Sequence, residues 1–235
     1  MFSERVSPFS FVGPKRMIPP AIKMNQLPKI DIVLISHNHY DHLDIASLSK
    51  LSNINNETIF LVPEGDKKSL VNAGIKNTFE FKWWDNFQLN GTTFTFTPAK
   101  HWSARGLFDE SRSLWGGWHV GNDSLNLFHA GDTGYSDDFK LIKKKLGKVD
   151  LALIPIGAYS PYWFEGYSHV TPDEAIQIAI DLEATKSIGM HWGTFILSDE
   201  PILEPKEWLN ISSKKENLDF ITVKPGELID LRFEF

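Results

Sequence analysis

Short apolar runs, separated by polar and glycine-containing segments, divide the chain into predicted strands and helices. The continuous apolar runs within residues 30–35 and 150–156 are typical of buried strands. Residues 92–97 instead alternate in polarity behind Asn90-Gly91, a pair that favours a two-residue hairpin turn. Further strands are predicted over residues 58–62, 79–84, 87–89, 113–120, 125–129, 187–190, 220–223 and 228–233.

Helices are predicted between these strands. The segment Thr171-Pro172-Asp173-Glu174 combines an N-cap residue, a proline at the first helical position and early acidic residues, so a helix is expected from there to about residue 184. Other helices are predicted near residues 44–51, 64–72, 137–146 and 205–210. Residues 1–28 contain five prolines and predict an extended lead-in. Because strands and helices interleave without a repeat or a linker, we expect one α/β domain over residues 1–235, built in α+β layers.

The composition narrows the classes of protein that the chain can represent. It has 235 residues, 42% of them hydrophobic and 23% charged, which is typical of a globular protein. The net charge of -6 gives no electrostatic basis for nucleic-acid binding. The chain has no cysteine, no apolar run of membrane-spanning length and no signal-peptide pattern. We therefore expect a cytoplasmic protein whose metal sites, if any, use histidine and carboxylate ligands.

Residues 36–42, Ser-His-Asn-His-Tyr-Asp-His, bring three imidazoles and one carboxylate into the loop that follows the first strand. The potential ligands are His37, His39, Asp41 and His42. Such side chains suit zinc, iron or manganese. The alternative is a set of surface histidines, but the spacing His-x-His-x-Asp-His is far more specific than a single His-x-His pair.

Three further potential ligands also stand where predicted strands end. His101 follows the strand at 92–97, Asp132 follows the strand at 125–129, and His191 follows the strand at 187–190. The glycines Gly131 and Gly134 flank Asp132 and allow the backbone to approach a ligand closely. Four strand ends are therefore expected to present ligands at one edge of the sheets.

This order of ligands resembles the metallo-β-lactamase superfamily, whose fold is an αββα sandwich. Within it, the chain is similar to the branch of N-acylphosphatidylethanolamine-hydrolysing phospholipase D enzymes and their bacterial relatives. The segments that carry this resemblance are residues 13–16 (Gly-Pro-Lys-Arg), 36–44, 97–102 (Thr-Pro-Ala-Lys-His-Trp), 114–118 (Leu-Trp-Gly-Gly-Trp), 130–135 (Ala-Gly-Asp-Thr-Gly-Tyr), 154–159 (Ile-Pro-Ile-Gly-Ala-Tyr) and 191–195 (His-Trp-Gly-Thr-Phe).

The resemblance implies two zinc ions and a phosphodiesterase of the phospholipase D type. The first ion would be held by His37, His39 and His101, and the second by Asp41, His42 and His191. Asp132 would bridge the two ions, which would share a hydroxide that attacks phosphorus. Asp41 and Asp132 are thus the expected catalytic carboxylates, and a small-molecule or lipid phosphodiester is the expected substrate.

Other predicted contacts are less direct. By the same resemblance His169 lies near the phosphate, with a packing role as the alternative. Tyr159 and residues 162–164 form an aromatic loop predicted to contact acyl chains or the inner face of a membrane, with core or lid packing as the alternative. His129 is expected to be buried and hydrogen-bonded. Arg105 and Arg112 are interpreted as solvated or ion-paired, and a phosphate contact is the alternative.

The resemblance also implies that the family's first strands, which precede the position of Phe2, are missing from this sequence. The first sheet would then expose an edge, and a homo-oligomer is one way to cover it. Alternative functions on the same fold are a sugar-phosphate lactonase or another ester hydrolase. A nuclease is disfavoured by the acidic charge. A non-catalytic metal-binding remnant is disfavoured because none of the seven ligand positions is lost.

Overall fold

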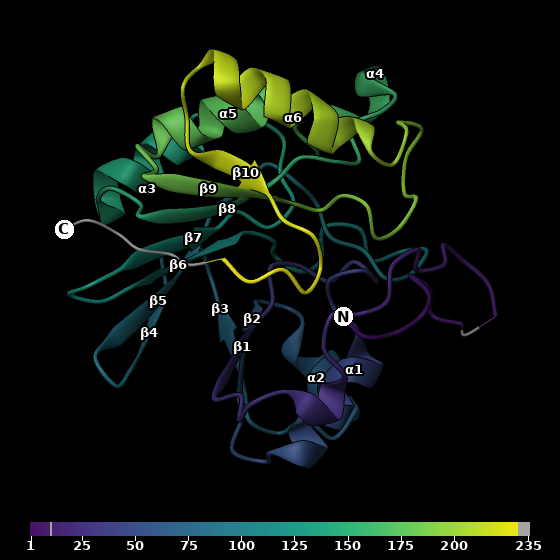
Figure 1. Ribbon diagram of the computed structural model, residues 1–235. Coiled ribbons are helices and arrows are strands. Elements are labelled where there is room, and N and C mark those ends of the chain that lie inside the picture. The colour runs from purple at the N-terminus through teal and green to yellow at the C-terminus, as the bar shows by residue number, and fades with distance from the viewer. Residues whose placement is uncertain (10, 230–235) are drawn as a thin grey trace.

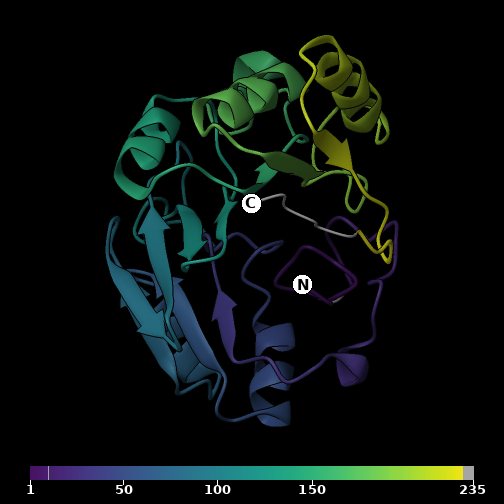
Figure 2. The ribbon, with the colours of Figure 1, turned by 60° about the vertical axis from the view of Figure 1, so that its left-hand side comes forward.

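Two β-sheets pack face to face, and helices cover the outer side of each sheet (Figure 1; Figure 2). The computed structural model describes residues 1–9 and 11–229. The layers thus follow the order helix, sheet, sheet, helix, and the predicted αββα sandwich is confirmed. In the described part of the lead-in, an isolated bridge pairs Arg5 with Lys15 and a 3-10 turn, η1, spans Met24–Gln26.

The smaller sheet has three parallel strands in the order β1-β2-β3. They span Ile32–Leu34, Ile59–Pro63 and Thr78–Phe81. The crossovers run through α1 (Ile45–Ile54) and α2 (Lys67–Asn72), which lie beside this sheet at the bottom of Figure 1. Parallel strands need a crossover connection between them, usually a helix, and α1 and α2 provide these crossovers.

The larger sheet has seven strands in the order β10-β9-β8-β7-β6-β5-β4. Neighbours from β4 to β7 are antiparallel, and neighbours from β7 to β10 are parallel. The strands are β4 (Asn86–Leu89), β5 (Thr92–Thr97), β6 (Gly117–Gly121), β7 (Asn126–His129), β8 (Leu151–Pro155), β9 (Lys186–Met190) and β10 (Phe220–Thr222). The helices along its parallel half are α3 (Asp138–Leu146), α4 (Tyr162–Glu165), α5 (Pro172–Asp181) and α6 (Glu204–Lys215).

The layer between the two sheets is filled by large side chains from both. Leu61 and Phe81 of the smaller sheet pack against Phe96 and Trp118 of the larger one, and all four are at most 6% exposed. The indole Nε1–H of Trp118 donates a hydrogen bond of 2.8 Å to the carbonyl of Ile35 at the end of β1. This bond ties the strand that leads into residues 36–42 to the opposite sheet.

Apart from the strand expected over residues 228–233, the predicted elements are present, and several of their ends differ from the prediction. The predicted strand 79–84 ends at Phe81, because a turn closes when the amide of Lys82 donates to Asp85. The helix expected from residue 64 begins at Lys67, the strand expected from residue 113 begins at Gly117, and α6 continues to Lys215. Residues 228 and 229 are not in a strand, and the rest of the predicted strand 228–233 lies outside the described residues.

Candidate metal centre

The four loops predicted to carry ligands meet at one place. They follow β1, β5, β7 and β9, and they bring together seven side chains: His37, His39, Asp41, His42, His101, Asp132 and His191. The seven fall into two groups, each with potential ligand atoms within 4.8 Å of one another. The division matches the two sets of potential ligands that the resemblance implies, with Asp132, the implied bridging residue, in the second group.

The first group contains three imidazoles. His39 Nδ1 lies 3.0 Å from His37 Nε2 and 3.3 Å from His101 Nε2. On the far side of the His101 ring, Nδ1 lies 3.0 Å from the carbonyl oxygen of Ser168, which can only accept a hydrogen bond. The Nδ1–H tautomer therefore leaves the His101 Nε2 lone pair facing the other two rings. Converging nitrogen lone pairs are what a cation with imidazole ligands requires.

The second group adds two carboxylates. Asp132 Oδ2 lies 2.9 Å from His42 Nε2 and 3.2 Å from His191 Nε2. Asp41 Oδ2 lies 3.1 Å and 3.2 Å from the same two nitrogens. Asp132 Oδ2 is also 3.8 Å from His37 Nε2 in the first group. Asp132 is therefore the residue that stands between the two groups.

The charges of the second group favour a bound cation. Burial alone would raise the pKa of Asp132, but His191 and His42 hold it well below its usual range. Burial alone would lower the pKa of His42, but Asp132 and Asp41 together raise it well above its usual range. The buried carboxylate of Asp132 and the partly buried one of Asp41 thus need positive charge beside them, which either protons on the histidines or a metal ion can provide.

The donor set fits borderline divalent metal ions. Nitrogen and carboxylate oxygen are the only ligand types, which suits zinc, iron or manganese. Oδ1 of Asp132 is buried and has no hydrogen-bond partner among the described residues. A buried carboxylate oxygen without a donor is costly, and a cation would satisfy it.

The loop around Asp132 depends on two glycines. Gly131 has φ +68°, and a Cβ there would lie 2.5 Å from the carbonyl oxygen of Gly116. A Cβ on Gly134 would lie 2.0 Å from the carbonyl oxygen of Tyr167. Both distances are shorter than non-bonded atoms tolerate. These glycines therefore let the loop pack against its neighbours and place Asp132 between the two groups.

A cavity of about 640 Å³ opens onto both groups. His39, His101, Asp41, Asp132 and His191 form part of its floor. Its aromatic wall contains Trp102, Trp115, Phe164 and Tyr167. The site can therefore admit a ligand with a substantial apolar portion.

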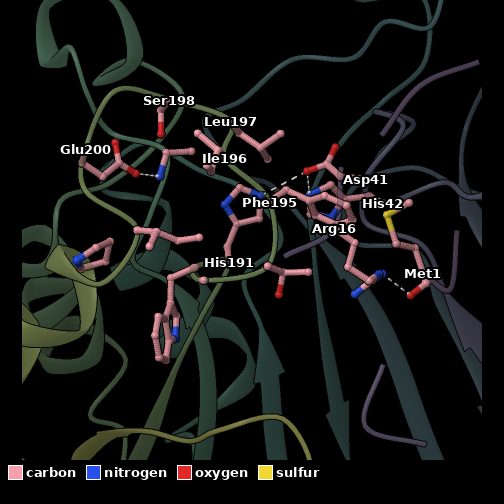
Figure 3. A pocket seen from close by; sticks show the side chains of 16 residues that line it. Met1, Arg16, Asp41, His42, His191, Phe195, Ile196, Leu197, Ser198 and Glu200 are labelled. Atoms are coloured by element: carbon pink, nitrogen blue, oxygen red, sulfur yellow. Dashed lines mark hydrogen bonds and ion pairs between the residues drawn. The ribbon is translucent and has the colours of Figure 1, made fainter. Parts of the chain in front are cut away.

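A second cavity of about 260 Å³ reaches Asp41, His42 and His191 from another side (Figure 3). Arg16 and the apolar chain around Phe195 form its walls, and the guanidinium of Arg16 stacks 4.8 Å from the Phe195 ring. Asp41 and His191 line both cavities. The cluster is thus accessible from two directions.

The structure brings His169 to the cluster. Its ring stacks on His191 with 5.5 Å between centroids, and it lines the larger cavity. Burial lowers the pKa of His169 to about 4, so the ring is neutral near pH 7. Its Nδ1 is buried without a hydrogen-bond partner among the described residues. His169 can therefore offer a polar contact to a ligand.

Tyr159 lies elsewhere. Its hydroxyl donates a 2.7 Å hydrogen bond to Glu204, and its ring packs edge-on against Trp208 of α6. Tyr159 does not line either cavity beside the cluster. The neighbouring residues 162–164 form α4, which the sequence did not predict as a helix. His129, expected to be buried, is half-buried, and its Nδ1 accepts a hydrogen bond from the amide of Gly131, as the expected hydrogen bonding requires.

Two contacts that support the cluster were missed from the sequence. Arg105, interpreted as solvated or ion-paired, in fact donates to the main-chain carbonyls of Asn38 and Leu43. Asp66 is 1% exposed and accepts a 3.0 Å hydrogen bond from the Asn38 side chain. Arg105 lies four residues after His101, but nothing local shows which carbonyls it reaches.

The fold and the cluster define the class of protein. A family model described as "Beta-lactamase superfamily domain" matches residues 7–192, and the chain belongs to this family. Among solved structures, an isothiocyanate hydrolase from Delia radicum gut bacteria superposes with a TM-score of 0.73 at 16% identity, covering 97% of this chain and 88% of the other. A metallo hydrolase from the archaeon Ignicoccus hospitalis gives 0.68 at 23% identity, covering 88% and 81%.

Curated relatives narrow the family further. The chain is 41% identical to N-acyl-phosphatidylethanolamine-hydrolyzing phospholipase D 1 of Caenorhabditis elegans, over 97% of this chain and 68% of that protein. It is 44% identical to the mitochondrial N-acyl-phosphatidylethanolamine-hydrolyzing phospholipase D of Saccharomyces cerevisiae, over 85% of this chain but only 44% of the yeast protein. The predicted family branch and the predicted enzyme class, a metal-dependent hydrolase, are confirmed by these matches.

Proposed function

We propose that the chain is a two-metal phosphodiesterase that hydrolyses a phospholipid of the N-acylphosphatidylethanolamine type. The observation that carries this proposal is the pair of ligand groups joined by Asp132. The identity to two phospholipases D supports the substrate class. Two-metal sites are suited to phosphodiester hydrolysis because charge develops on both the attacking and the leaving oxygen.

Zinc is the metal we expect, with iron or manganese as the alternatives. His37, His39 and His101 would hold one ion, Asp41, His42 and His191 the other, and Asp132 would contact both. Ions bound there supply positive charge to phosphoryl oxygens and lower the pKa of water.

The remaining residues of the cavity serve binding. Neutral His169 can donate or accept one hydrogen bond at the phosphate, at the side of His191. The aromatic wall with Trp102 and Phe164 suits an acyl chain. An acyl chain packed against this wall would leave the phosphate of the same molecule close to the two groups of potential ligands.

A peripheral membrane contact accompanies this proposal. Trp163 on α4 is 85% exposed, and its neighbour Phe164 is 66% exposed and also lines the cavity. Aromatic side chains with this exposure suit the headgroup region of a bilayer. No helix in the described part of the chain is both long and apolar enough to span a membrane. Weaker binding of W163A to phospholipid vesicles, with I211A on α6 (70% exposed) as the matched control, would support the contact.

The decisive experiment measures metal content and turnover together. D132N and H101A should lose bound metal and at least about 100-fold in activity, in line with the loss of an essential catalytic contact. H119Q changes a buried histidine on β6 outside the cluster and serves as the matched control. Phosphodiester, lactone and nucleic-acid substrates are compared with and without a chelator. Full metal occupancy and wild-type turnover in D132N and H101A would refute the assignment, and chelator-sensitive turnover of lactones alone would redirect it to a lactonase.

A further inference from the structure

Residues 38–43 contain three of the seven potential ligands, His39, Asp41 and His42. This segment is a loop with turns between β1 and α1, so it has no sheet or helix ladder of its own. The carboxylates of Asp41 and Asp132, which lie 3.1 Å and 2.9 Å from the same His42 nitrogen, also repel each other when no cation neutralises them. Inside the segment the amides of His42 and Leu43 donate to the carbonyl of His39, and contacts from outside the segment hold its two ends.

Arg105 contacts both ends of that segment. The same guanidinium nitrogen donates to the carbonyl oxygen of Asn38 at 2.7 Å and to that of Leu43 at 2.8 Å. The two carbonyls bracket the four residues that contain the three ligands. Because these acceptors are neutral main-chain groups, the bonds fix the path of the backbone and not the charge of a particular ligand.

Tyr40 at the centre of the segment completes the attachment. The guanidinium stacks over its ring at 4.1 Å, and its hydroxyl donates a 2.7 Å hydrogen bond to the carbonyl oxygen of Arg105. Arg105 thus contacts the beginning, the middle and the end of residues 38–43.

The segment that carries Arg105 is itself held firmly. The carboxylate of Asp109 accepts hydrogen bonds from the amides of Arg105 and Gly106, at 3.1 Å and 2.7 Å. At its base the hydroxyl of Ser103 donates to the carbonyl of Ser113 at 2.6 Å. This closed loop, residues 103–113, begins two residues after His101. It therefore connects a ligand of the first group to the ligands of residues 38–43.

We propose that Arg105 is a positioning residue that holds residues 38–43 in the conformation that binds the metal ions. It acts through the backbone of the ligands and does not contact the substrate. The inference rests on the proposed function only in that the seven residues bind metal.

The test measures zinc affinity directly, in the absence of substrate, by competition with a chromophoric chelator. R105A should bind zinc about 10- to 100-fold more weakly, the range observed when partners of metal ligands are removed. R105K should lie between R105A and wild type, because an ammonium can donate to carbonyls but cannot stack its plane on Tyr40. R112A removes an exposed arginine of the same loop and should bind zinc like wild type. The absorption of cobalt-substituted protein should change in R105A and not in R112A.

Several results would overturn the proposal. R105A with wild-type zinc affinity and a raised KM would make Arg105 a substrate contact. An equal loss in R112A would make the effect a general one of charge. Should R105A fail to fold, the zinc affinity of R105K takes its place as the test. Wild-type zinc affinity in R105K would then overturn the positioning role of Arg105. A wild-type chain that binds no zinc would refute both the proposed function and the positioning role of Arg105. If the wild type binds zinc and R105A binds it equally well, only the positioning role is refuted.

Discussion

Asp66 offers a test of how the polar groups beneath the ligand loop contribute to stability. Its carboxylate accepts a hydrogen bond from Asn38, but its second oxygen is buried without a partner among the described residues. Burial raises the pKa of Asp66 from 3.8 to about 6, against the opposing effects of Ser113, Asn38 and Arg105. The folded protein therefore keeps a proton on Asp66 up to about pH 6, whereas the unfolded chain loses it near pH 4.

The sign follows from proton binding. Between pH 4 and 6 the folded state binds more protons than the unfolded state, so this residue lowers the free energy of unfolding as the pH rises. A difference of about 2 pH units corresponds to about 3 kcal/mol. In D66N the amide cannot ionise. The variant should thus gain about 3 kcal/mol relative to wild type between pH 4 and 7.

Urea unfolding of both proteins at several pH values, with chelator present throughout, measures this difference. The chelator keeps the protein free of metal, so that proton release linked to metal binding does not contribute to the pH dependence. D123N in the exposed turn between β6 and β7 is the matched control and should parallel wild type, since its side chain is solvated in both states. If the difference between D66N and wild type stays constant from pH 4 to 7, Asp66 is not the titrating group and the reasoning fails.

Two further predictions concern the scaffold. T171A removes a capping box, in which the Thr171 hydroxyl accepts a hydrogen bond from the amide of Glu174 and the Glu174 carboxylate accepts one from the amide of Thr171. The variant should lower the free energy of unfolding in urea by about 1 kcal/mol. An unchanged midpoint would contradict the role of the cap. G134A places a Cβ 2.0 Å from the carbonyl oxygen of Tyr167. It should lower the free energy of unfolding by about 1–3 kcal/mol and weaken zinc binding, because the loop that carries Asp132 is displaced. G147A at the end of α3, where a Cβ has open space, should leave zinc binding unchanged.

Much of the fold could be predicted because its signals are local. The N-cap at Thr171 and the hairpin at Asn90-Gly91 depend on neighbouring residues, and both are present as expected. The clustering of the seven potential ligands could be predicted because imidazoles and carboxylates recur shortly after apolar runs. Strand ends of a layered sheet meet at an edge, so the sequence positions sufficed to predict that these side chains come together.

The remaining features depend on contacts between distant parts of the chain. Arg105 binds the carbonyl of Asn38, 67 positions away, and no periodicity shows such a bond. Tyr159 lies in the loop that follows β8, four residues after Pro155, a position typical of a site residue. Its hydroxyl is nevertheless turned toward Glu204, 45 positions away, because α6 packs there. Whether a side chain faces a cavity or a neighbouring helix is decided by packing, and local pattern does not encode it.

The chemistry of the potential ligands explains why contacts from outside residues 38–43 are needed to hold them in place. Asp132 is 3% exposed, so the cluster buries a carboxylate whose charge must be balanced by protonated histidines or by a cation. A sequence of ligands on flexible loops would relax outward to reach water. Hydrogen bonds to neutral main-chain carbonyls oppose this outward movement without competing for the cation. They are the bond between His101 and the Ser168 carbonyl and the bonds from Arg105 to the carbonyls of Asn38 and Leu43. In the proposed metal site these bonds would hold the potential ligands at binding distance before an ion arrives, so less of the binding free energy would be lost in ordering them.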